Sequence, residues 1–341
     1  SHLAEGVDYT RQYLWSATYS DLRTERYLEY TPNELVQPAV AYGDTVLSKS
    51  TLSSLAQALE NAGKRVLGGI NGDYFVLATG APLGLVVTDG VLRSSSSYHY
   101  ALGFDADGNA FIGKPELSIT ATFGGSTYAV SGGLNKVRTD NNYVLYTDDF
   151  AATTNHTKPG IDVILTPSAE KLDQTVHVDL EVEDVPESED ADSGEIDPIT
   201  GSADLDEEDV PQGGGTAGQV KGTLVYTDEP AIGARMSCTV TAVLQSTGSI
   251  AIPAGSLVLS ISSDSSEWLV SQLSSLQVGD TVDIDITSPD ERWASAVTAV
   301  GAFYKMVTGG VVESGLDTTQ APRTAVGVRA DGSTVFYTVD G

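Results

Sequence analysis

Short apolar runs separated by turn residues dominate the chain and predict a β-rich fold. Three pairs of such runs flank turns rich in Gly and Asp, at residues 83–87 and 91–93, 101–104 and 110–112, and 117–123 and 127–130. Turns of this kind favour hairpins because Gly supplies the positive φ angles that a tight turn requires. Residues 7–47 show mixed strands and turns, and further strands are expected at 219–226, 235–244, 257–261 and 281–286.

Helical periodicity appears in only two places. An apolar i, i+3, i+4, i+7 pattern predicts a helix over residues 50–62, with Ser50 at its N-cap and Gly63 after its end. A shorter helix is expected over 265–276, where the apolar residues share one face. Few helices among many strands predict an α+β fold with β-rich mixed sheets and a few packed helices.

An unusual stretch, residues 66–75, follows the first predicted helix directly. It begins as an apolar run, breaks at a Gly pair, and then presents Asn71, Asp73 and Tyr74 within four residues. A buried strand has no local reason to hold an amide, a carboxylate and a phenol so close together. We therefore expect a strand that delivers polar groups to a cleft, with glycines that permit close approach.

Charge and length exclude several classes of function. The chain has 341 residues, 40% of them hydrophobic, which is enough for a substantial core. Its net charge of −29 disfavours nucleic acid and anionic lipid as partners. No apolar run is long enough to predict a membrane span. A single cysteine, Cys238, excludes both an intramolecular disulfide and a cysteine metal cluster.

Acidic residues crowd the segment 181–218, and no Lys or Arg occurs between Lys171 and Lys221. Such a composition predicts a flexible, solvated insertion, because it buries too little apolar area to offset ordering. Metal binding by its carboxylates is the alternative. The turn at 105–109 resembles the opening of a calcium loop, but its Gly comes too early. We expect no cofactor, with calcium as the alternative.

Two motifs resemble those of the phosphodiester glycosidase family. Residues 70–75, Ile-Asn-Gly-Asp-Tyr-Phe, are similar to the family's Asn-Gly-Gly-Phe-Phe motif. Residues 321–328, Ala-Pro-Arg-Thr-Ala-Val-Gly-Val, precede a turn at Asp331 and an apolar strand that ends in Asp340-Gly341. This arrangement resembles the family's Arg-Thr-Ala-x-Gly strand, its turn and its final Asp-Gly-Arg. The order of the two motifs is also that of the family.

The resemblance implies one domain over residues 6–341, interrupted by the insertion at 181–218. Family members continue beyond Asp-Gly with an Arg, a helix and a Gly-rich loop. The resemblance therefore implies a C-terminally incomplete domain and an incomplete active site. It also implies an uncovered sheet face, through which the chain could associate.

Cleavage of a sugar-1-phosphodiester between C1 and oxygen requires a carboxylate near C1 and positive charge on the phosphate. We expect Asp73 and Asp340 to be the catalytic carboxylates and Arg323 to bind phosphate, because a guanidinium bonds two oxygens at once. The expected substrate-binding residues also include Asn71, Tyr74, His99 and Thr324. The plainer alternatives are an Asx turn at Asp73, a simple turn at Asp340, a surface salt bridge at Arg323 and a surface histidine at His99.

The predicted function is hydrolysis of a phosphodiester-linked sugar by a glycoside hydrolase. The resemblance implies α-linked N-acetylglucosamine and an extracellular or cell-envelope location. A non-catalytic module that binds cell-wall polysaccharide is the alternative. The chain lacks a Gly-x-Ser-x-Gly elbow, a His or Cys cluster and a phosphate-binding P-loop, which argues against serine-hydrolase, zinc and nucleotide chemistry.

Overall fold

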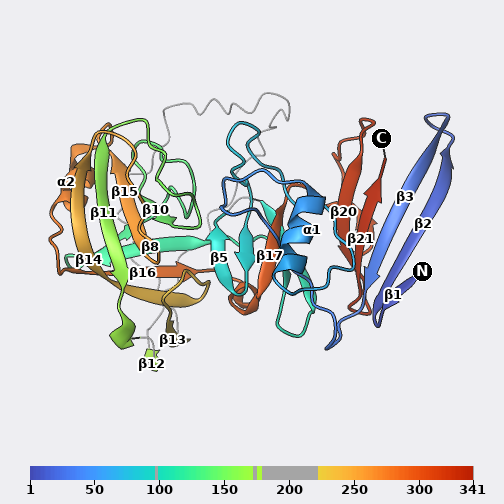
Figure 1. Cartoon of the computed structure of the whole chain (residues 1–341), viewed down its shortest axis with the longest axis horizontal. Helices are drawn as coiled ribbons and strands as arrows, with labels where there is room; N and C mark the ends of the chain where they lie inside the picture. The colour runs from blue at the N-terminus through green and yellow to red at the C-terminus, as the bar shows by residue number, and fades with distance from the viewer. Residues whose placement is uncertain (97–98, 172–174, 179–221, 341) are drawn as a thin grey trace. The chain divides into compact units, whose positions relative to one another are not determined.

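The computed structural model describes residues 1–96, 99–171, 175–178 and 222–340 (Figure 1). The predicted acidic insertion at 181–218 lies outside the described residues. Contacts divide the chain into two compact units, Ser1–Gln174 with Val225–Gly341, and Thr175–Leu224. Strand β12 (Thr175–Val178) of the second unit pairs with β13 (Gly222–Tyr226). The candidate site described below belongs entirely to the first unit.

The first and last strands of the chain share one sheet, named here the terminal sheet. Its order is β1-β2-β3-β21-β20, and all its pairs are antiparallel. Figure 1 shows the blue N-terminal strands beside the red C-terminal ones. The strands are β1 (His2–Ala4), β2 (Val7–Ser16), β3 (Asp21–Tyr30), β20 (Arg323–Val328) and β21 (Thr334–Val339).

Two further sheets complete most of this unit. The central sheet has the order β5-β4-β17-β6-β7, and the large sheet has the order β10-β15-β11-β14-β16-β8-β9. The central strands are β4 (Val86–Thr88), β5 (Val91–Ser94), β6 (Tyr100–Phe104), β7 (Ala110–Gly113) and β17 (Thr298–Ala302). The large sheet holds β8 (Ser118–Phe123), β9 (Ser126–Ala129), β10 (Val144–Thr147), β11 (Gly160–Pro167), β14 (Ala234–Ser246), β15 (Leu257–Ser262) and β16 (Thr281–Thr287). A small hairpin joins β18 (Val307–Thr308) to β19 (Val311–Val312).

Both predicted helices form. They are α1 (Leu52–Asn61) and α2 (Glu267–Ser274), with short 3-10 turns η1 (Ala169–Lys171) and η2 (Glu291–Ser295). The N-cap of α1 is Thr51 rather than Ser50, because the Thr51 hydroxyl accepts a hydrogen bond from the Ser54 amide at 3.2 Å. The β-rich α+β fold is therefore confirmed. No helix among the described residues is long and apolar enough to cross a membrane.

The three predicted hairpins are confirmed as β4–β5, β6–β7 and β8–β9. Both central residues of the first turn, Asp89 and Gly90, have positive φ angles of 52° and 78°. This is the conformation that the Asp-Gly pair predicts. The strand expected at 66–75 does not form: only Phe75 makes an isolated bridge, to Pro82. The glycines of this stretch offer little side-chain surface to hold it in a sheet.

The central sheet is buried on both faces. Leu85, Val87 and Leu92 belong to one core with the large sheet. Leu102 and Phe104 belong to a second core with the terminal sheet, in which the Phe104 ring lies 6.2 Å from the ring of Phe336. Cores on both faces hold the strands of the central sheet in place. The ends of those strands are thus rigid positions from which a site can be built.

Candidate functional site

Several site segments meet at one end of the central sheet. Strand β4 follows Gly84, strand β17 ends shortly before Phe303, and strand β6 begins directly after His99. Because β17 pairs antiparallel with both β4 and β6, these three positions lie at the same end of the sheet. The backbone amide of Gly301 donates to the carbonyl of Leu85 at 2.8 Å and closes this end.

The Asp73 carboxylate occupies a gap that two glycines leave open. A Cβ atom placed on Gly84 would lie 2.0 Å from Asp73 Oδ2, and one placed on Gly301 would lie 2.2 Å from the same atom. Neither glycine has a positive φ angle, so the requirement for Gly here is steric. The two glycines therefore form a cradle around the carboxylate, and we name it the Asp73 cradle.

Asp73 is only partly satisfied by its neighbours. Its Oδ1 atom accepts a hydrogen bond from the Tyr74 amide at 2.7 Å, whereas the buried Oδ2 atom has no partner among the described residues. Burial raises the pKa of Asp73. The Tyr74 amide, the charge of His99, the Gly84 amide and the charge of Lys136 act in the opposite direction. The Gly84 amide lowers the pKa of Asp73 by its proximity, although its geometry does not meet the criteria for a hydrogen bond to Oδ2. A buried carboxylate with an unpaired oxygen and a perturbed pKa marks a candidate functional site.

Lys136 lies beside this carboxylate and was not predicted from the sequence. Its Nζ atom donates to the carbonyl oxygens of Pro82 at 2.8 Å, Leu83 at 3.3 Å and Gly84 at 3.5 Å. Burial lowers the pKa of Lys136 to about 8, and the negative charge of Asp73 works against that shift. The ammonium therefore holds the loop that contributes Gly84 to the Asp73 cradle, and it places a positive charge near Asp73.

The position of Lys136 is set by its neighbour, Asn135. This residue is fully buried and has a left-handed φ angle of 55°. Its side-chain nitrogen donates to the Arg93 carbonyl and to the Thr147 hydroxyl, each at 2.8 Å, and its side-chain oxygen accepts from the Thr147 amide at 2.9 Å. These bonds tie the loop to strand β10. A lone Lys outside every motif gives no sequence signal of this arrangement.

The structure brings the two sequence motifs together. The Thr324 hydroxyl on β20 donates to the Asn71 side-chain oxygen at 2.6 Å, although 253 residues separate them. Two other predicted residues meet at Phe303. Its ring lies 5.6 Å from that of Tyr74 and 5.2 Å from that of His99. Thus Thr324 contacts the segment that carries Asp73 through Asn71, and His99 is connected to it through Phe303 and Tyr74.

Arg323 is not brought to this group. Its guanidinium donates to the carboxylate of Asp317 and to the carbonyl of Thr319, each at 2.9 Å. Because neighbouring residues on a strand point to opposite faces, Arg323 lies on the face of the terminal sheet away from Thr324. Arg323 therefore forms a salt bridge with Asp317, as in the alternative to phosphate binding that the sequence left open.

Asp340 occupies a structural position at the end of β21. Its carboxylate accepts a hydrogen bond from the Thr24 amide at 2.6 Å, which lowers the pKa of Asp340 and ties this strand end to β3. The role of Asp340 as a second catalytic carboxylate stays a prediction.

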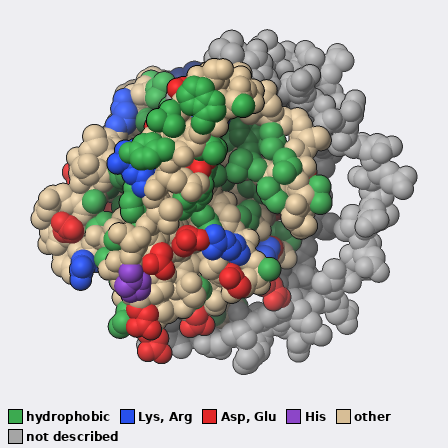
Figure 2. All heavy atoms as spheres, turned by 90° about the vertical axis from the view of Figure 1, so that its right-hand side faces the viewer, with side chains coloured by type: hydrophobic (Ala, Val, Ile, Leu, Met, Phe, Trp, Pro, Cys, Tyr) green, Lys and Arg blue, Asp and Glu red, His purple; other side chains and the backbone are tan. Residues whose placement is uncertain are grey.

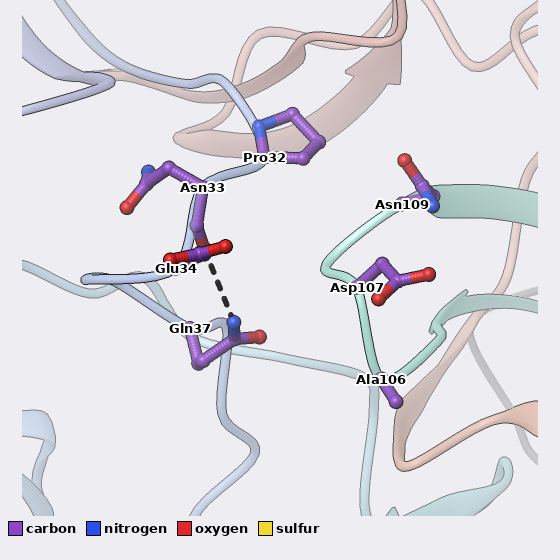
Figure 3. Close-up of a pocket in the computed structure, with 7 residues that line it drawn as sticks. All are labelled: Pro32, Asn33, Glu34, Gln37, Ala106, Asp107 and Asn109. Atoms are coloured by element: carbon purple, nitrogen blue, oxygen red, sulfur yellow. Dashed lines mark hydrogen bonds between the residues drawn. The ribbon is translucent and has the colours of Figure 1, made fainter.

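A cavity of about 360 Å³ lies elsewhere, beside the predicted turn at 105–109 (Figure 3). Its lining residues are Pro32, Asn33, Glu34, Gln37, Ala106, Asp107 and Asn109, none of them a predicted site residue. Asp105 closes the turn, because its carboxylate accepts from the amides of Asp107 and Asn109. Among the residues that the structure describes, no three or more His, Cys, Asp or Glu side chains are grouped to hold a metal. We therefore place the candidate site at Asp73.

The geometry defines a β-rich α+β protein with a carboxylate site at one end of its central sheet. The model of the phosphodiester glycosidase family matches residues 215–341, and this confirms the resemblance noted in the sequence. The matched part includes Gly301, Phe303 and Thr324. Asp73 lies outside it.

A solved structure shares the fold. The crystal structure of a hypothetical protein from Synechocystis matches with a TM-score of 0.63 and 14% identity, over 98% of this chain and 51% of that chain. At this identity the likeness shows the fold alone. The present chain spans about half the length of that protein. No curated protein matches.

Proposed function

We propose that this chain hydrolyses a sugar-1-phosphodiester at the bond between C1 of the sugar and the phosphate oxygen. The family match supports a function of the phosphodiester glycosidase type in general. The observation that carries the finer proposal is the Asp73 cradle. It holds a carboxylate with an unpaired oxygen beside the Lys136 ammonium and close to Asn71, which binds Thr324.

The proposed reaction uses one carboxylate and one water molecule. As the C1–O bond breaks, its electron pair moves to the phosphate oxygen, which leaves as a phosphate monoester. Positive charge develops at C1, where the Asp73 carboxylate stabilises it and accepts a proton from the water that adds to C1. A phosphate is already a good leaving group, so the reaction places little demand on a general acid. Lys136 favours the ionised form of Asp73 through its charge.

The remaining predicted residues bind the sugar in this proposal. Asn71 and Thr324 offer an amide and a hydroxyl to the sugar hydroxyls. The rings of Tyr74 and His99 each contact the ring of Phe303, the first edge-on and the second tilted, and the three form an aromatic wall. Aromatic faces are suitable surfaces for a sugar ring. We further propose α-linked N-acetylglucosamine as the sugar, and an extracellular or cell-envelope location, as the family resemblance implies.

A non-catalytic polysaccharide-binding module is the second candidate. It is favoured by the exposed aromatic side chains on β2, where Tyr13 is 60% exposed and Trp15 is 63% exposed. Such rings can stack on sugars without any catalysis. The two candidates differ in turnover: a hydrolase releases free sugar, whereas a binding module only retains the glycan.

The test is release of free N-acetylglucosamine from an N-acetylglucosamine-1-phosphodiester. Asp73→Asn removes the negative charge while preserving the shape of the side chain, and we expect the rate to fall by about 100-fold or more. Asp89→Asn, at the exposed turn between β4 and β5, is the matched control and should leave the rate unchanged. Polysaccharide binding without turnover would favour the second candidate.

A further inference from the structure

Two arginines lie directly opposite each other on the face of the terminal sheet that carries Thr324. The strand register pairs Arg11 with Arg26, Arg26 with Thr338, and Thr338 with Thr324. Because directly paired residues share a face, these four side chains form one row across four strands. The row ends at Asn71, which accepts a hydrogen bond from Thr324. We name it the arginine row.

The arginine row borders the core and the candidate site. Two residues further along the strands, Leu28, Phe336 and Val326 form the adjacent row of the same face, and all three belong to the core with the central sheet. A Cβ atom placed on Gly68 would lie 3.4 Å from Leu28, so the segment that leads to Asn71 passes over this apolar row. Arg26 is therefore half-buried at the rim of the site.

The pairing of Arg11 with Arg26 is unfavourable in the absence of an anion. Like charges directly opposite on adjacent strands destabilise a sheet. Within the described residues, neither arginine has a carboxylate at ion-pair distance, even though the chain contains 47 acidic side chains against 18 basic ones. Asp340, on the same face, accepts a hydrogen bond from the Thr24 amide, and the charge of Arg26 also helps to lower the pKa of Asp340, but the two side chains are not at ion-pair distance. Arg11 instead lies over the Tyr13 ring, 5.1 Å from its centre.

Figure 2 shows the molecule from the side of β2 and β3. Most acidic side chains of this view lie in its lower half, and several basic side chains lie among hydrophobic ones in its upper half. Other basic side chains lie among the acidic ones in the lower half, so only the basic side chains of the upper half are separated from most of the acidic groups. An anion can be attracted there despite the negative charge of the whole chain.

We propose that Arg26, assisted by Arg11, binds the phosphate of the substrate, so that the arginine row is an anion subsite for a sugar phosphate. This inference rests on the proposed function and names the part of the site that holds the leaving group. Two strand spacings, about 10 Å, separate Thr324 from Arg26. A sugar at Asn71 and Thr324 can then reach the Arg26 guanidinium with its phosphate. The planar guanidinium donates to two phosphate oxygens at once, and the bound charge removes the repulsion between the arginines.

The experiment compares Arg26→Gln and Arg26→Lys with the control Arg323→Gln. The probes are N-acetylglucosamine-1-phosphate and free N-acetylglucosamine, and their dissociation constants are measured by calorimetric titration. Arg26→Gln should weaken binding of the sugar phosphate about tenfold or more, with little change for the free sugar. Arg26→Lys should retain part of the affinity, since it keeps the charge but loses the fork of donors. Arg323→Gln should bind both probes as the original chain does.

A stability measurement separates this role from a purely structural one. Without ligand, Arg26→Gln should have a melting temperature equal to or higher than that of the original chain, because one of the two like charges that face each other is removed. Equal affinity of Arg26→Gln and the original chain for the sugar phosphate would overturn the subsite, as would equal losses for both probes.

The two proposals fail in different ways. Binding of the sugar phosphate that depends on Arg26, without sugar release from the diester, would refute hydrolysis and support the subsite. Sugar release at an unchanged kcat/KM in Arg26→Gln would support hydrolysis and refute the subsite.

Discussion

The most incisive perturbation of the candidate site is the addition of one methyl group at Gly84. The Cβ atom of Gly84→Ala would lie 2.0 Å from Asp73 Oδ2 and 2.7 Å from the Cα atom of Gly301. Carbon and oxygen atoms that are not bonded do not approach so closely. The carboxylate must therefore move by about 1 Å or more, or the strand end that carries Gly301 must move with it.

The expected size of the effect follows from that displacement. Overpacking of this kind costs about 1–3 kcal/mol of unfolding free energy. A catalytic group misplaced by about 1 Å loses about 100-fold in rate. Gly84→Ala should therefore reduce sugar release far more than its loss of stability alone explains, since most of the protein remains folded. Gly301→Ala should behave alike, because its Cβ atom would lie 2.2 Å from the same oxygen.

The assay pairs urea denaturation with the kinetics of sugar release. Gly327→Ala is the matched control: Gly327 lies on β20, has no positive φ angle, and offers open space to a Cβ atom. Its stability should change by less than about 0.5 kcal/mol and its activity should not change. If Gly84→Ala keeps the activity and stability of the original chain, the Asp73 cradle is refuted. It is also refuted if Gly327→Ala loses as much activity and stability as Gly84→Ala.

Three further variants test the surroundings of the site and the buried charges of the fold. The pKa of Lys136, about 8, lies below its unfolded value of 10.5, so the unfolded state binds more protons between these values and stability rises with pH there. Lys136→Met should lose this rise in denaturation midpoints, and the acid limb of its kcat/KM profile should move to higher pH, because the charge that lowers the pKa of Asp73 is gone. Asn135→Ala leaves buried backbone groups unpaired and should cost about 1–3 kcal/mol by urea denaturation. Asp162 is fully buried, 3.8 Å from Arg138, so Asp162→Ala should cost about 3–5 kcal/mol by the same measurement.

Each of these expectations has a contradicting outcome. An unchanged pH profile of Lys136→Met would show that its charge does not act on Asp73. A neutral Asn135→Ala would mean that the loop finds its position without these hydrogen bonds. If Asp162→Ala is as stable as the original chain, the hydrogen bonds that Arg138 donates to its other acceptors must suffice to hold its charge.

Local features of the fold were predictable because short stretches determine them. The turn at Asp89 and Gly90 and the helix α1 both follow from residues close together in sequence. The segment 66–75 was predicted as a strand from its apolar start, yet strand formation also requires a partner with a free edge. Its position over Leu28 depends on a sheet built from both ends of the chain, which no local pattern reports.

The candidate site was predictable only in part. The motif carrying Asn71 and Asp73 stood out because its polar residues interrupt an apolar run. Lys136 and Gly301 reach the site from distant segments that carry no motif, so only the fold reveals them. Arg323 was predicted to bind phosphate from its residue type and its motif. Side chains alternate along β20, however, so Arg323 lies on the other face of the sheet from Thr324. Deciding which arginine serves a site requires the strand register as well as the motif.

The central claim is that the bond between C1 and oxygen breaks at the site of Asp73. Hydrolysis of an N-acetylglucosamine-1-phosphodiester in water labelled with heavy oxygen tests it most directly, with mass spectrometry of both products. The account predicts the label in the C1 hydroxyl of the released sugar, and loss of that product in Asp73→Asn. Label in the phosphate monoester would show cleavage at phosphorus instead, and would contradict the assignment of this chain as a glycosidase.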